Sequence, residues 1–79
     1  MQLRKAFGLV VSTERKALEL TQTELAERGG LHFTAVSMLE RGSRPANFDT
    51  LVLISSALGV PLSDLFRRAE ELQKSHPDS

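Results

Sequence analysis

Residues 21–42, TQTELAERGGLHFTAVSMLERG, contain two helical patterns that are separated only by a glycine pair and a leucine. Thr21 and Glu24 have the spacing of an N-terminal capping box, which predicts a helix that begins directly after Thr21. Gly29 can adopt the left-handed conformation of a helix C-cap, and Gly30 then allows a sharp turn. Because the next helical pattern starts so soon, the second helix is predicted to be held at a fixed angle to the first.

The second of these helices has two chemically different sides. If His32 is its N-cap, a rotation of about 100° per residue puts Ala35, Val36 and Leu39 on one side, which is predicted to be buried. Gly42 is predicted to end the helix. The opposite side is predicted to face outward and carries an aromatic ring, two hydroxyls, a thioether and a cation: Phe33, Thr34, Ser37, Met38 and Arg41.

Three further helices are predicted around this pair, and no strand alternation appears, so the fold class is all-α. Asn47 is the predicted N-cap of a fourth helix that ends at Gly59. The last residues, 75–79, are expected to be frayed. The inward residues are Leu3, Phe7, Val10, Val11 and Leu18 in the first helix, Leu51, Ile54 and Leu58 in the fourth, and Leu62, Leu65, Phe66, Ala69 and Leu72 in a fifth helix that follows VPLSD.

Length and composition limit the possible sites. The chain has 79 residues, 41% of them hydrophobic, which predicts a single domain, residues 1–79, near the lower size at which a core supports itself. It has no cysteine for a disulfide or a thiolate metal site. His32 and His76 lie far apart in the sequence without a clustered carboxylate, so they are expected to cap a helix and to lie in a solvated tail. No catalytic residue, metal site or cofactor is predicted.

The charge balance gives no general reason to bind a polyanion, because 10 basic and 10 acidic residues leave a formal net charge of zero. The segment from Arg28 to Phe48 differs, since it holds three basic residues and one acidic residue. No apolar run approaches the roughly 20 residues of a membrane span. Charges near Met1 also interrupt any signal-peptide core, so a cytoplasmic protein without a membrane partner is expected.

These patterns resemble the XRE-like helix-turn-helix regulators, which include phage Cro and repressor proteins and restriction-modification controller proteins. The characteristic residues of that family appear here as Thr21-Gln22, Leu25-Ala26, Gly30 and Glu40-Arg41-Gly42, and PANFDTLVLISSALGVPLSDLF matches its second half. The resemblance covers about residues 7–66. It implies a compact, five-helix, lambda-repressor-like domain whose third helix lies in the DNA major groove while the second helix crosses above it.

The resemblance also implies roles on a DNA surface. Gln22 matches a glutamine that contacts a phosphate. Arg41 and Arg44 are predicted to contact phosphates because the local charge is positive, the alternative being solvated surface cations. The positions that match base-facing residues are Phe33, Thr34, Ser37 and Met38.

The base-facing positions depart from the usual pattern of the family. Many relatives carry glutamine, arginine or asparagine on this side, whereas Phe33 and Met38 cannot make a bidentate hydrogen bond. Met38 or the methyl group of Thr34 can contact a thymine methyl, and the two hydroxyls can donate or accept. Phe33 is expected to fold partly against the edge of the core or against backbone sugars.

Two residues outside the turn matter for stability. Arg15 and Glu40 match an arginine and a glutamate that pair between the first and third helices, and a partly buried bridge is predicted. Glu19 stands where relatives often have a glycine that ends the first helix. A non-glycine residue in the left-handed region costs roughly 1 kcal/mol. This cost favours a first helix that ends in a different way.

The fifth helix is predicted to form a symmetric dimer, because Phe66, Ala69 and Leu72 carry more apolar surface than the other helices are expected to cover. The alternative is that this stripe packs on its own domain. Few residues follow the helix, so no effector domain and no small-molecule effector are expected.

The resemblance therefore favours a sequence-specific transcription regulator that binds double-stranded DNA as a homodimer on a roughly palindromic operator. The alternative is a protein-binding module on the same fold, such as the antitoxin of a toxin–antitoxin pair. An enzyme is not expected, since no nucleophile, base or metal-ligand constellation is present.

Overall fold

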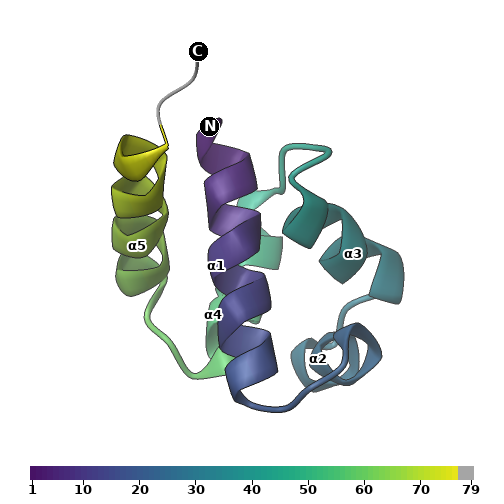
Figure 1. Ribbon diagram of the computed structural model, residues 1–79. Helices are drawn as coiled ribbons and strands as arrows, with labels where there is room; N and C mark the ends of the chain where they lie inside the picture. The colour runs from purple at the N-terminus through teal and green to yellow at the C-terminus, as the bar shows by residue number, and fades with distance from the viewer. Residues whose placement is uncertain (77–79) are drawn as a thin grey trace.

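Five α-helices follow one another in the computed structural model, which describes residues 1–76 (Figure 1). No strand occurs among these residues. The predicted all-α fold with five helices is therefore confirmed. The helices span Leu3–Ala17 (α1), Gln22–Gly29 (α2), Phe33–Arg41 (α3), Phe48–Leu58 (α4) and Leu62–Ser75 (α5).

α5 extends almost to the last described residue. Ser75 is still helical, and His76 follows as the C-cap, with its amide 3.1 Å from the Leu72 carbonyl. Residues 75 and 76, which belong to the stretch expected to be frayed, are thus the last helical residue and the C-cap. The rest of that expectation, residues 77–79, lies outside the described residues.

α2 begins with the predicted capping box. The Glu24 amide donates to the Thr21 hydroxyl over 3.0 Å, and the Thr21 amide donates to the Glu24 carboxylate over 2.9 Å. The predicted C-cap is displaced by one residue, because Gly29 is still helical and Gly30 has the left-handed backbone, with a φ of 67°. Gly30 therefore makes the reversal that sends the chain into α3.

α1 is followed by a non-glycine residue whose backbone conformation is strained. Glu19 has a φ of 59°, the left-handed conformation of a glycine C-cap, so the different ending that the sequence suggested for this helix is not found. The Leu20 amide donates to the Arg15 carbonyl over 3.1 Å and the Glu19 amide to the Lys16 carbonyl over 2.9 Å, which is the Schellman pattern. Leu18, predicted to be inward, is 44% exposed, because it follows the last helical residue and reaches only a shallow groove beside α4.

Every helix contributes one of the five largest fully buried side chains to the core. α1 packs mainly against α5 on one side and α3 on the other, while α4 packs against α2 and α5. Figure 1 shows the α2–α3 pair and α5 on opposite sides of α1. No single helix can therefore bury its apolar face alone. The five largest fully buried side chains are Val11, Leu25, Val36, Ile54 and Leu65.

α1 approaches the C-terminal end of α3 so closely that a side chain would not fit between them. A Cβ at Gly8 would lie 2.4 Å from the Leu39 carbonyl oxygen and 2.5 Å from that of Glu40. A Cβ at Gly42, which has a φ of 64°, would lie 2.7 Å from the Cα of Lys5. These two glycines set the position of α3 relative to α1.

The described helices fit a small globular body of 36 × 21 × 21 Å. None of them alone has the length and hydropathy of a membrane-spanning helix. α4 and α5 together reach that composition, but they are bent by 101° at the break between them.

Candidate nucleic-acid interface

α2 and α3 are joined by three residues and pack against each other. The turn is fixed by its backbone, since the Leu31 amide donates to the Ala26 carbonyl over 2.8 Å. α3 lies at the edge of the molecule, on the far side of α1 from α5 (Figure 1). The side of α3 that faces away from α1 is therefore accessible to a ligand.

The two predicted sides of α3 are present in the structure. Val36 is fully buried and Leu39 is 5% exposed, while Ala35 is only half-buried. On the opposite side, Phe33, Thr34 and Arg41 are exposed, and Ser37 and Met38 are half-buried. The structure thus brings the predicted base-facing residues together on one outer surface.

Phe33 is not packed on the core, which was one of the two positions expected for it, the other being contact with backbone sugars of DNA. It is the first residue of α3, is 49% exposed, and is not among the partly buried residues packed on the core. The only aromatic pair among the described residues joins Phe7 and Phe66. Position explains the difference, because the first turn of α3 projects away from α1, whose close contact is with the other end of the helix.

Glu40 connects three helices through a nearly buried network. It pairs with Arg15, whose Nε lies 2.7 Å from Oε2 and whose Nη2 lies 3.0 Å from Oε1. The two side chains are 11% and 6% exposed. The hydrogen bond to Glu40 raises the pKa of Arg15, and burial opposes that shift only in part. Arg15 Nη1 also donates to the Leu20 carbonyl over 2.7 Å, which ties the network to the strained end of α1.

Gln22, a predicted phosphate ligand, belongs to the same network. Its Nε2 donates to Glu40 Oε1 over 2.9 Å, a contact that was not expected from the sequence. The side-chain amide has two N–H groups, so this bond leaves one for another acceptor. Gln22 is also the first residue of α2, where backbone amides have no intrahelical partner.

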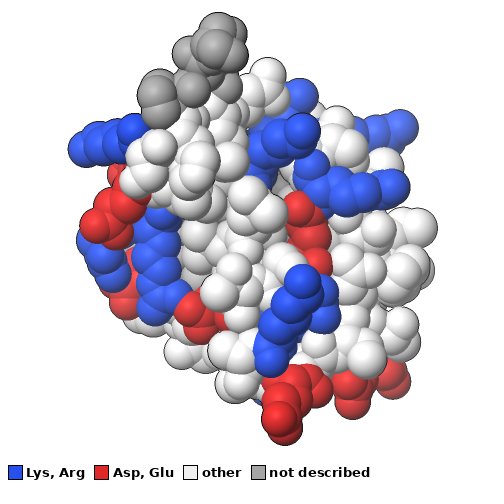
Figure 2. Space-filling view, viewed as in Figure 1, with Lys and Arg blue, Asp and Glu red and all other residues white. Residues whose placement is uncertain are grey.

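Four basic residues lie around the end of α3, and we call them the basic cluster: Arg4, Lys5, Arg41 and Arg44. Arg4 Nε donates to the Gly42 carbonyl over 3.1 Å, and Lys5 lies directly against Gly42. Figure 2 shows basic side chains gathered beside α3 and the following loop, and acidic side chains below α2. Arg4 and Lys5 were not expected here from the sequence, because only the packing of α1 on α3 brings them near Arg41 and Arg44.

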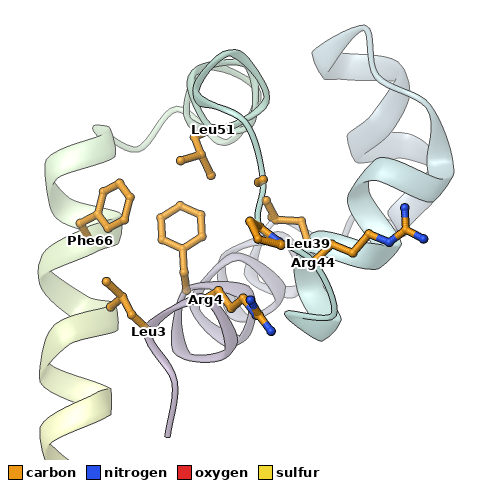
Figure 3. Close-up of a pocket in the computed structure, with 9 residues that line it drawn as sticks. Leu3, Arg4, Leu39, Arg44, Leu51 and Phe66 are labelled. Atoms are coloured by element: carbon orange, nitrogen blue, oxygen red, sulfur yellow. The ribbon is translucent and has the colours of Figure 1, made fainter.

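An apolar groove of about 310 Å³ lies between α1, α5 and the loop after α3 (Figure 3). Phe66 of α5 lies on one side of it, with its ring centroid 4.8 Å from that of Phe7. Arg4 and Arg44 line the other side, and their guanidinium groups point away from the apolar side chains (Figure 3). Their aliphatic stems therefore cover apolar surface while their charges remain at the rim.

The predicted dimer residues of α5 are largely used within their own chain. Ala69 is fully buried, so its part of the expected interface is wrong: a second chain could not touch its side chain. Phe66 is half-buried against Phe7, and Leu72 is half-buried in a shallow groove with Leu9. An ion pair between Arg68 and Glu14 also holds α5 on α1.

α4 exposes apolar side chains that were not predicted to be exposed. Phe48 is 71% exposed, Val52 42% and Leu53 40%, whereas Ile54 and Leu58 of the same helix are buried. A helix that is apolar on more than its core side usually has a second surface to cover. The signal was present in the sequence, because FDTLVLISSAL has no basic residue and a single acidic one.

The histidines have no common site. His32 occupies the N-cap position of α3, but its side chain makes no cap hydrogen bond. His76 Nδ1 lies 3.2 Å from the Leu72 carbonyl oxygen. Among the residues that the structure describes, no three His, Cys, Asp or Glu side chains are grouped to hold a metal ion.

Comparisons with known proteins match this arrangement. A helix-turn-helix family model matches residues 11–65. Control protein C.BamHI of Bacillus amyloliquefaciens is 39% identical over 64 residues, which are 80% of this chain and 79% of that protein. Control protein C.SmaI of Serratia marcescens is 31% identical over 68 residues, 86% of this chain and 81% of that protein. The solved structure of a variant of the restriction-modification controller protein C.Esp1396I has a TM-score of 0.85 and 28% identity, and the match covers 96% of each chain.

Proposed function

Because the chain belongs to the helix-turn-helix family of DNA-binding transcription regulators, we propose that it is a sequence-specific regulator of the restriction-modification controller type that acts in the cytoplasm. It binds double-stranded DNA with α3 in the major groove and α2 above it. Its action is binding and not catalysis. The observation that carries this proposal is the outer side of α3, which is exposed beside the basic cluster.

Phosphate contacts hold the domain in register on the duplex. The basic cluster lies around the C-terminal end of α3, and Gln22 at the start of α2 bonds Glu40 in the same part of that helix, so cationic side chains and free backbone amides are both available to phosphates there. Gln22 contributes its second N–H group, with its side chain held by Glu40. Arg41 and Arg44 contribute charge, and both are exposed. Since the whole chain is neutral, this local arrangement supplies the attraction to DNA.

Base contacts come from the outer side of α3. Thr34 and Ser37 carry hydroxyls that can donate or accept, and Phe33 and Met38 carry apolar surface. Hydrogen bonds to base edges and contacts with methyl groups are the two means of direct readout in the major groove. The set is therefore sufficient for sequence preference, although it lacks a bidentate donor in its centre.

The regulator acts as a symmetric dimer that includes α4. Val52 and Leu53 are exposed on the helix whose other side holds Ile54 and Leu58 in the core, so a second copy can cover them without disturbing the fold. Leu72 of α5 remains a second candidate. A dimer should bind a roughly palindromic operator with half-sites about 34 Å apart, one helical turn of DNA. Control then follows protein concentration, with no small-molecule effector.

Sedimentation tests the dimer. We expect the wild-type chain to be dimeric at micromolar concentration and a V52E/L53E variant to be monomeric and folded. The matched variant L72E should stay dimeric, and melting curves check that each variant folds. If L72E were monomeric and V52E/L53E dimeric, the dimer interface would lie on α5 and not on α4. A wild-type monomer that binds single half-sites as well as paired ones would contradict the dimer.

Selection of bound fragments from random duplex DNA, followed by sequencing, tests the function itself. We expect enrichment of one motif with two inverted halves. A second candidate function is a protein-binding module such as an antitoxin, which the zero net charge and the exposed Phe33 and Phe48 favour. Absence of any enriched motif would make that module the better account.

A further inference from the structure

We propose that Phe33 recognises the 5-methyl group of a pyrimidine, so that the preferred DNA sequence requires a thymine next to the first turn of α3. This inference rests on the proposed function, because it needs α3 in the major groove. It adds the chemical feature that is read and the residue that reads it.

The outer side of α3 offers little discrimination by hydrogen bonding. Asparagine, glutamine and arginine distinguish adenine or guanine by bidentate bonds, but only Arg41, the last residue of the helix, is of that kind. The hydroxyls of Thr34 and Ser37 can donate or accept, so they fit several base edges. The remaining means of direct readout is apolar contact, and in unmodified DNA only thymine presents a methyl group in the major groove.

Phe33 is the apolar side chain best placed for that contact. The N-terminal residues of a recognition helix meet the base edges, and Phe33 is the first residue of α3. It is 49% exposed and takes part in no aromatic pair. Ser37 follows four residues later on the same side of the helix, so the ring has a small polar neighbour that leaves its outer surface free.

Met38 is the less suitable reader. It is half-buried and lines a shallow groove with Asn47 and Thr50, at the opposite edge of the outer side from Phe33. Its thioether is therefore partly covered by the start of α4. Phe33 is more accessible, since it is 49% exposed, and aromatic contact with a thymine methyl removes apolar surface of both groups from water.

The methyl group can be removed without altering base pairing. Starting from the motif found by random selection, each thymine is replaced in turn by uracil, which differs only by the 5-methyl group. We expect one position per half-site where the dissociation constant rises about fourfold, the value for one buried methyl group. Replacement in both half-sites should raise it about 15-fold.

Protein variants assign that methyl group to Phe33. F33A should bind the thymine and uracil duplexes equally at this position, whereas F33L should keep part of the preference. L9A is the matched control, because Leu9 is 46% exposed but lies on α1, and it should discriminate as the wild type does. At the same position, 5-methylcytosine should bind more tightly than cytosine.

The outcomes separate this inference from the proposed function. If the wild-type protein selects a motif but tolerates uracil at every position, Phe33 reads no methyl group and the regulator stands. If F33A keeps the full preference for thymine, another residue reads it and the assignment is wrong. If no motif is enriched, the proposed function fails first. The uracil scan uses only the wild-type protein. It therefore shows whether a thymine methyl group is recognised even if F33A folds poorly.

Discussion

At the scale of single residues, Glu19 is the only described non-glycine residue with a left-handed backbone. Replacing it with glycine should stabilise the fold by about 0.5–1 kcal/mol, because the steric cost of the Cβ in this region disappears and part of the gain is offset by the freer unfolded chain. Urea unfolding of E19G measures the change. E19A is the control, since it removes the charge but keeps the Cβ. Equal stability of the two variants would contradict the strain.

The Arg15–Glu40 pair is the second prediction at this scale. E40A should lower the free energy of unfolding by about 3–5 kcal/mol, because Arg15 would remain nearly buried without its partner and Gln22 would lose its acceptor. A double-mutant cycle with R15A measures the coupling. The exposed Glu27 of α2 gives a control, since E27A should change stability by less than about 0.5 kcal/mol. A cycle without coupling would show that the bridge adds nothing.

At the scale of the element, α2 depends on its capping box in a way that pH can reveal. Hydrogen bonds from the Thr21 amide and hydroxyl hold the pKa of Glu24 below its ordinary value of 4.5. A carboxylate with a lowered pKa in the folded state stabilises the fold above its unfolded pKa, and that stabilisation disappears as pH falls through the folded value. The wild-type protein should therefore lose stability in acid, below about pH 4.5, in part through Glu24.

Urea unfolding between pH 7 and pH 2 measures this loss. E24Q should be less stable than the wild type at neutral pH and should approach it in acid, where the wild-type carboxyl is protonated as well. E27Q serves as the control at the other end of α2. If E24Q and the wild type differed by the same amount at every pH, the ionised capping box would not be the cause.

At the scale of the whole molecule, positioning on DNA and reading of its sequence should be separable. R44A should weaken binding to preferred and random DNA alike, and lower the salt slope by about one unit for each phosphate that Arg44 neutralises, counted twice in a dimer. S37A should keep that slope and weaken binding by roughly 1–3 kcal/mol on the preferred site only. K74A, on α5, is the control for removal of one charge outside the proposed DNA surface. Titrations at several salt concentrations measure both quantities. If R44A and S37A bound preferred and random DNA with the same affinity and salt slope as the wild type, α3 would not lie in the major groove.

The sequence by itself determined the features that depend on neighbours within about one helical turn. The Thr21–Glu24 box, the Asn47 cap and the turns at Gly42 and Gly59 all form as predicted, because each is set by backbone conformation and hydrogen bonds between nearby residues. The two sides of α3 follow in the same way from the helical period. The one-residue displacement from Gly29 to Gly30 shows the limit, since either glycine can adopt the conformation that ends α2.

The tertiary structure alone decided which distant residues share a surface. Arg4 and Lys5 join the basic cluster because Gly8 and Gly42 let α1 and α3 come close, and no local pattern encodes that approach. α5 covers α1 with Ala69, so this side chain is not available to a partner, while α4 leaves Val52 and Leu53 exposed. An apolar stripe indicates that one side of a helix must be buried. It does not indicate which helix or which second chain buries it, because the hydrophobic effect is non-directional. Only the packing of all five helices determines which stripes are already used.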